Sequence, residues 1–213
     1  MFNKFFFSVV LFAFSTLFAQ NESQQVNLIL DKTAQKYSSL STFSINFSVK
    51  IGAENLVLQN FDGTLLVKKE KYFITFEDQI IANDGNMVWN YQKNINEVSI
   101  FEVEDDFFAI FSPNKMLNNW NKEYSAKFIR KEESQKKMNF IVDLTPKMKS
   151  QFYKIRLYIE EVTSYISMIM MYDVEGTTFT YSISKFLPND FVSDDKFIFN
   201  LNDYPNVQVN DMR

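Results

Sequence analysis

Adjacent acidic residues are the groups in this chain with the clearest potential for chemistry. They occur at Asp105-Asp106, Glu132-Glu133, Glu160-Glu161 and Asp194-Asp195. Two carboxylates can serve as general acid and general base when both point into one site. Neighbouring residues of a strand point to opposite faces of a sheet, however, so such pairs are typical of solvated surface. The sequence therefore gives little support to a hydrolase that uses paired carboxylates.

Most other catalytic chemistry is excluded by two missing residue types. The chain contains no cysteine and no histidine. Thiol nucleophiles, Ser-His-Asp triads and His-ligated zinc are therefore impossible, and no disulfide can support the fold. The turn Asp173-Val174-Glu175-Gly176 falls short of a calcium loop, and the chain has no Gly-rich phosphate loop and no Gly-x-Ser-x-Gly elbow. We expect no metal, no cofactor and no enzymatic activity.

Burial of apolar groups is the remaining chemistry that the composition favours. The chain has 24 Phe and 10 Tyr, which prefer strands and bury large areas. Its formal net charge of −4 argues against nucleic acid as a partner, because nucleic acid selects clustered Lys and Arg.

The first residues have the pattern of a secretory signal peptide. Lys4 precedes an apolar stretch, residues 5–18, which ends at Ala19 and is followed by polar residues. We expect a signal peptide over residues 1–19 and one mature domain over residues 20–213. The mature chain should be released rather than anchored, since no Cys follows the apolar stretch for lipidation.

The apolar periodicity predicts a helix followed by a meander of strands. Val26, Ile29, Leu30, Ala34 and Tyr37 share one helical face. A cap at residues 112–113 predicts one or two short helices over residues 114–120. The expected strands cover roughly residues 43–51, 55–61, 63–69, 72–77, 79–83, 87–92, 97–103, 124–130, 138–144, 153–160, 166–173, 177–186 and 196–199.

These strands predict a mainly β fold, with one curved antiparallel sheet of about eleven strands. The turn at residues 83–86, Asn-Asp-Gly-Asn, is a strong hairpin signal. If the sheet curls without closing, the N-terminal helix and the short helices are available to cover its concave face. A space lined by Phe, Ile, Leu and Met beneath them would suit an acyl chain.

Period-2 alternation selects the side chains that would face this space. The inward face of residues 72–77 stays open, because Phe73 competes there with Tyr72 and Ile74. For each candidate the alternative is an ordinary core position. The candidates are Phe43, Ile45, Phe47, Leu65, Val67, Phe73, Trp89, Tyr91, Ile155, Leu157, Met168, Met170, Phe179 and Tyr181.

Several short stretches, in order along the chain, resemble one known family, the outer-membrane lipoprotein carriers called LolA. Residues 63–69, GTLLVKK, resemble its Gly-x-Leu-x-Val-Lys-Arg strand, and residues 83–91, NDGNMVWNY, resemble its Asp-Gly, Leu-Trp-x-Tyr hairpin. Residues 144–147 match its Leu-Thr-Pro-Lys. Residues 196–199 and 207–211 resemble its Phe-x-Phe strand and its Val-x-Val-x-Asp tail.

The resemblance implies an incomplete β-barrel covered by helices and located in the periplasm. It implies a carrier that binds the acyl chains of lipoproteins, receives them from an inner-membrane ABC transporter and passes them to an outer-membrane acceptor. The alternative is a related half-barrel module that carries another acyl lipid or senses mislocalised lipoproteins. We expect a monomer.

One departure from the family pattern concerns the lid. The family has Lys-Arg-Pro, in which the Arg bonds the helical lid, whereas this chain has Lys68-Lys69-Glu70. Lys69 takes the Arg position and is the expected latch. It keeps the charge but lacks the planar fork of five donors.

Overall fold

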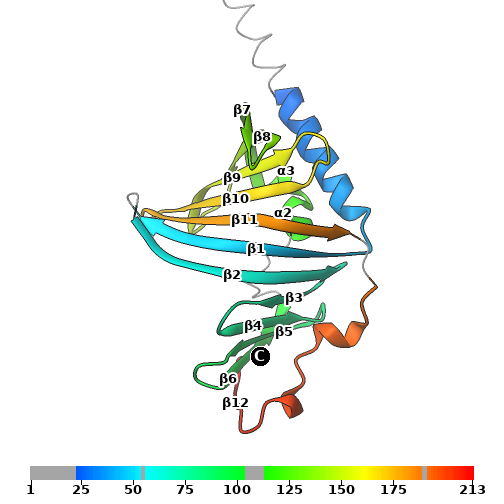
Figure 1. Cartoon of the computed structure of the whole chain (residues 1–213), viewed down its shortest axis with the longest axis vertical. Helices are drawn as coiled ribbons and strands as arrows, with labels where there is room; N and C mark the ends of the chain where they lie inside the picture. Colours follow the sequence, from blue (N-terminus) through cyan, green and yellow to red (C-terminus); the bar gives the residue numbers. More distant parts are fainter. Residues whose placement is uncertain (1–22, 54–55, 104–112, 189–190) are drawn as a thin grey trace, which may run out of the picture.

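One sheet of 12 strands organises the computed structural model, which describes residues 23–53, 56–103, 113–188 and 191–213 (Figure 1). The predicted signal peptide, residues 1–19, and the pair Asp105-Asp106 lie outside the described residues. The strands are β1 Thr42–Ala53, β2 Leu56–Lys68, β3 Lys71–Thr75, β4 Gln79–Asn83, β5 Met87–Gln92, β6 Glu97–Glu102, β7 Tyr124–Ser134, β8 Lys137–Pro146, β9 Phe152–Glu160, β10 Ile166–Asp173, β11 Thr177–Pro188 and β12 Gln208–Asp211.

The sheet is open, as predicted. Its order is β12-β6-β5-β4-β3-β2-β1-β11-β10-β9-β8-β7, so β12 and β7 are its two edges. Strand β1 lies at the centre and pairs with β2 on one side and β11 on the other. The first and last antiparallel strands of the domain are thereby hydrogen-bonded together.

One longer α-helix and two short α-helices complete the described fold. The predicted N-terminal helix covers residues 23–38 and runs beside the sheet, while α2 Pro113–Leu117 and α3 Trp120–Glu123 lie behind the sheet in the view of Figure 1. No helix in the described ranges is long and apolar enough to cross a membrane.

Three sequence expectations about the strands are wrong. Residues 55–61 and 63–69 form one strand, β2, because Gly63 continues the strand and leaves room for the Phe47 ring instead of breaking the ladder. Residues 196–199 form no strand, because Asp194–Phe197 is a 3₁₀ helix, η3, whose first residue pairs with Lys68 and Lys71. Strand β12 is parallel to β6, so pairing is not antiparallel throughout.

The sheet carries a separate apolar cluster on each of its faces. The inner cluster joins the sheet to the helices. It consists of Val26, Leu30, Tyr37, Leu40, Phe43, Ile45, Phe47, Val49, Leu65, Val67, Tyr72, Ile74, Ile81, Val88, Phe101, Met116, Leu117, Trp120, Val142, Leu144, Ile155, Leu157, Ile159, Ile166, Ile169, Met171 and Tyr181. The outer cluster consists of Ile80, Ala82, Tyr91, Val98, Ile100 and Phe199.

The outer cluster is covered by the C-terminal segment. Residues 191–211 include η3, η4 Leu201–Asp203 and β12, and follow the β3–β6 end of the sheet (Figure 1). The rings of Phe199 and Tyr204 stack with centroids 4.3 Å apart, and Tyr91 lies 5.1 Å from Phe199 and 4.4 Å from Tyr204. The β3–β6 part of this face is closed by the chain itself.

Candidate functional site

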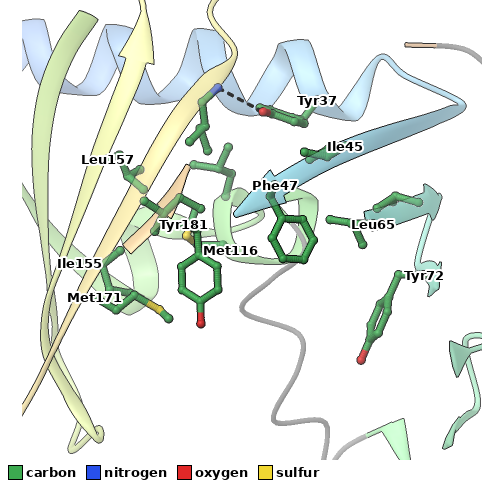
Figure 2. Close-up of a cluster of buried hydrophobic side chains, with 14 of the residues drawn as sticks. Tyr37, Ile45, Phe47, Leu65, Tyr72, Met116, Ile155, Leu157, Met171 and Tyr181 are labelled. Atoms are coloured by element: carbon green, nitrogen blue, oxygen red, sulfur yellow. Dashed lines mark hydrogen bonds between the residues drawn. The ribbon is translucent and has the colours of Figure 1, made fainter. Parts of the chain in front are cut away.

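The inner cluster holds most of the side chains that the sequence predicts to face a cavity. Phe47 and Leu65 approach from β1 and β2, and Leu157 and Met171 from β9 and β10, with Met116 of α2 among them (Figure 2). Phe179 is half-buried against the same cluster. The predicted residues placed here are Phe43, Ile45, Phe47, Leu65, Val67, Ile155, Leu157, Phe179 and Tyr181.

Three predicted cavity residues lie on the opposite face. Tyr91 belongs to the outer cluster, and Phe73 and Trp89 pack against it. In β3, Tyr72 and Ile74 face the helices instead. Alternation could not decide between the faces, because the side chains on the outer face of these strands are apolar as well. The C-terminal segment covers them. The prediction that these three side chains point inward is therefore wrong.

Met168 and Met170 are also misplaced by the sequence prediction. Ile169 and Met171 belong to the inner cluster, so their strand neighbours point to the other face. There the Tyr172 hydroxyl contacts Met170 Sδ at 3.8 Å. Residues Met168–Met171 are all apolar, so alternation along the strand could not show which of them face the helices.

A small cavity lies within the inner cluster. It measures about 30 Å³ and is lined by Ile45, Phe47, Leu65, Pro113, Ile169, Met171, Tyr181 and Ile183. The described lining comes from β1, β2, β10, β11 and the first residue of α2, and among these residues the Tyr181 hydroxyl is the one polar side-chain group. Burial raises the pKa of that hydroxyl, so it is neutral at physiological pH. The described lining residues can hold apolar groups and contribute no charged side chain.

One polar contact joins the N-terminal helix to the sheet, and another joins that helix to α3. The Tyr37 hydroxyl is fully buried and accepts a hydrogen bond of 3.1 Å from the Ile166 amide of β10, shown dashed in Figure 2. Burial raises the pKa of Tyr37, which keeps the hydroxyl protonated. Trp120 of α3 donates from Nε1 to Asp31 Oδ1 of the N-terminal helix at 3.0 Å.

The predicted latch is not formed. Lys69 occupies the turn between β2 and β3 with a φ of 55°, in the left-handed region, and is exposed. It lies beside the N-terminal helix and α2, as the family position implies, since it lines a groove with Gln35 and Asn114. Within the described ranges, however, its ammonium makes no hydrogen bond or ion pair.

Its neighbours Lys68 and Lys71 make a different contact. Their ammonium groups lie 2.7 and 3.1 Å from the carboxylate of Asp194, and Lys68 also donates to the Val192 carbonyl at 2.8 Å. Hydrogen bonds from Lys68 and then Lys71 lower the pKa of Asp194. This lysine clamp fixes the C-terminal segment to the β2–β3 turn. No local sequence signal joins groups more than 120 residues apart.

The acidic pairs do not form acid and base couples in the described part of the chain. Glu132 pairs with Arg130, Glu160 with Lys137, and Glu161 with Lys131 at 2.6 Å. Each of these three carboxylates thus pairs with a cation rather than with its acidic neighbour. These contacts agree with the solvated-surface interpretation of the sequence.

A larger groove lies outside the inner cluster, between the N-terminal helix, α2, α3 and the β2–β3 turn. It measures about 670 Å³. We call it the amide groove after the side chains that line it, Gln35, Asn114, Asn118, Asn119 and Asn121. Leu117 also lines it and belongs to the inner cluster, so α2 separates the groove from the apolar interior.

Comparison with known proteins identifies the family of this half-open sheet and its helical cover. Over residues 38–200 the chain matches the family described as outer membrane lipoprotein carrier protein LolA. The chain belongs to the LolA family. Among individual relatives of this LolA family member, an uncharacterized protein of Methanocaldococcus jannaschii is 22% identical over 201 residues, which are 89% of this chain and 56% of that protein. The chain therefore spans about half the length of this relative.

Two solved structures are similar to this LolA family member. An uncharacterized conserved protein from Thermus thermophilus superposes with a TM-score of 0.61 at 10% identity, covering 88% of this chain and 99% of that chain. A LolA superfamily protein from Nitrosomonas europaea has a TM-score of 0.45 at 13% identity, covering 82% of this chain and 97% of the other. The first of these shows the same fold.

Proposed function

We propose that this LolA family member is a periplasmic carrier that binds the acyl chains of lipoproteins in the inner cluster and shuttles them from the inner to the outer membrane. The single observation that carries the proposal is the family match over residues 38–200 of a chain whose helix-covered sheet face is apolar. Binding by burial requires no catalytic group, so the carrier would not be an enzyme. Its partners would be an inner-membrane ABC transporter as donor and an outer-membrane acceptor.

The resting size of the cavity implies that loading opens the cover. A cavity of about 30 Å³ cannot hold an acyl chain, because ligand pockets measure about 300–1,000 Å³. Pro113, at the start of α2, lines the cavity, and Met116 and Leu117 of α2 are buried in the inner cluster. Movement of α2 away from the sheet would therefore create the volume.

The energy of acyl burial is sufficient for such opening. Each buried methylene contributes about 0.8 kcal/mol, so ten of them contribute roughly 8 kcal/mol. Removing the α2 side chains from the inner cluster costs a few kcal/mol, since a buried Leu or Met contributes about 1.5–3 kcal/mol. One acyl chain offsets that cost. The flexible thioethers of Met116 and Met171 allow the walls to repack around different chains.

A membrane-release assay tests the proposal. Inner-membrane vesicles from the source organism, containing a labelled lipoprotein, are incubated with ATP and the purified mature chain. We expect a soluble complex of the chain with the lipoprotein. The matched control is the same cargo with its acylated Cys replaced by Ser, which should give no complex. Release of acyl lipid without lipoprotein would overturn the proposal in favour of another lipid cargo.

A further inference from the structure

We infer that the amide groove binds the peptide segment that follows the acylated cysteine of the cargo, as an extended backbone held by side-chain amides. This inference rests on the proposed function and concerns the peptide part of the lipoprotein, as distinct from its acyl chains. The apolar interior would hold the acyl chains. The groove across α2 would hold the polar chain attached to them.

Unused hydrogen-bonding capacity is the first observation. Gln35, Asn114, Asn118, Asn119 and Asn121 line the groove, and none of their side-chain amides makes a hydrogen bond with any other residue that the structure describes. Asn114 Oδ1 is buried as well as unpaired. Buried polar atoms are normally paired, so this one would gain a partner from a ligand donor if a movement of α2 brought it to the surface of the groove.

The chemistry of the lining selects a peptide. Each side-chain amide offers N–H donors and a carbonyl acceptor, which match the C=O and N–H groups of a peptide backbone. A phosphate headgroup fits poorly, because the carboxylates of Asp31 and Glu70 line the same groove and Lys69 is the one cation among its described lining residues. The groove thus favours a neutral, amide-bearing ligand.

The position of the groove connects it to the acyl site. Pro113 lines the apolar cavity, while the next residue, Asn114, lines the groove. A ligand that enters under α2 would therefore emerge beside Asn114. In an acylated lipoprotein the peptide begins at the cysteine that carries the acyl chains. The groove volume of about 670 Å³ is in the range of sites that hold small ligands.

Binding measurements with two ligands distinguish a failure of this inference from a failure of the proposed function. The first is a synthetic peptide of five residues that begins with a triacylated cysteine and continues with neutral residues; the second is palmitate. The variant Asn114→Leu/Asn118→Leu keeps side-chain size and removes the amides. We expect about tenfold weaker binding of the lipopeptide and unchanged binding of palmitate, the loss that one or two hydrogen bonds produce.

The matched control is Gln92→Leu, which removes an exposed amide of β5 far from the groove and should leave both affinities unchanged. Equal loss for both ligands, or no loss for the lipopeptide, would overturn the inference and leave the acyl site standing. If the unaltered protein binds neither ligand, the proposed function fails and the inference fails with it.

A second measurement avoids any effect of the substitutions on folding. Because the chain has no cysteine, Gln35→Cys introduces a single thiol into the groove. A lipopeptide whose third residue is a cysteine carried as a mixed disulfide with thionitrobenzoate should form a disulfide with this variant and release thionitrobenzoate. It should not do so with Gln92→Cys. Equal cross-linking of both variants would contradict a peptide site in the groove.

Discussion

Gly63 shows how one residue shapes the inner cluster. A Cβ at this position would lie 2.6 Å from Phe47 Cζ and 2.8 Å from the Thr75 carbonyl oxygen. The Phe47 ring therefore occupies the space that a side chain would need. The sequence analysis expected separate strands at residues 55–61 and 63–69, whereas β2 runs unbroken through Gly63. A glycine in a strand can mark either a bend or a close approach of another group. Only the packed structure distinguishes these two uses.

We predict that Gly63→Ala lowers the free energy of unfolding by about 1–3 kcal/mol, the usual cost of overpacking. Phe47→Leu in the same chain should recover part of this loss, since it shortens the side chain but leaves the Thr75 carbonyl in place. Urea unfolding of the two single variants and the double variant measures the coupling. Strictly additive effects would show that the Phe47 ring does not limit this position.

The Tyr37 hydroxyl gives a second prediction at this scale. Tyr37→Phe leaves the buried Ile166 amide without its acceptor and should lower the free energy of unfolding by about 1–3 kcal/mol. Tyr165→Phe is the matched control, because Tyr165 packs on Tyr37 with centroids 5.7 Å apart and its hydroxyl makes no hydrogen bond within the described ranges. Equal costs in denaturant titrations would contradict a specific role for the Tyr37 contact.

Alternation predicted which side chains face the inner cluster where the other face of the strand is polar. In β1, Phe43, Ile45 and Phe47 alternate with Ser44 and Asn46, and all three lie in the inner cluster. It failed for Tyr91 and Met170, whose strands have apolar side chains on both faces. Alternation within a strand cannot show that a segment distant in the sequence will cover one face of that strand.

At the scale of elements, local turn chemistry explains which hairpins could be predicted. Strands β4 and β5 have the predicted bounds, because Asn83 Oδ1 accepts from the Gly85 amide at 2.7 Å and Gly85 has a φ of 98°. The 3₁₀ helix η3 and the parallel strand β12 could not be predicted. Both depend on contacts with distant strands, such as the lysine clamp on Asp194.

The lysine clamp predicts a pH dependence. Lys68 and Lys71 lower the pKa of Asp194 in the folded state, so its contribution to stability is present above the ordinary carboxyl pKa and is lost as the pH falls through the lowered value. Asp194→Asn should therefore lower the Tm at pH 7 but have little effect in strong acid. Thermal unfolding of both proteins across this range measures the difference.

Asp195→Asn is the control for the clamp, because within the described ranges no lysine pairs with Asp195. Its effect on Tm should not vary in the same way with pH. A Tm difference between Asp194→Asn and the unaltered protein that persists unchanged in strong acid would contradict the clamp.

The contact between Trp120 and Asp31 links the short helices to the N-terminal helix. Trp120→Phe removes the indole donor and keeps an aromatic ring in the inner cluster. If α2 and α3 must move for loading, the loss of about 1 kcal/mol of hydrogen bonding should speed both uptake and release of a fluorescent acyl ligand by about fivefold. Stopped-flow fluorescence measures both rates, and unchanged rates would contradict opening at this contact.

For the molecule as a whole, the proposed function depends on a difference between the two faces of one sheet. The C-terminal segment seals the outer cluster with stacked rings, whereas short helices cover the inner cluster and leave a small cavity beneath α2. The open, helix-covered sheet could be predicted from strand count and amphipathic periodicity. The face that would bind a ligand could not be predicted, because both faces carry an apolar cluster.

Photo-crosslinking in living cells tests this difference most directly. A photoreactive phenylalanine replaces Phe47 or Phe179 at the inner cluster, or Tyr91 in the outer cluster. We expect adducts with acylated lipoproteins at positions 47 and 179 and none at position 91, as identified by mass spectrometry. Equal adducts at all three positions, or none at 47 and 179, would contradict the claim that acyl chains bind between the helices and the sheet.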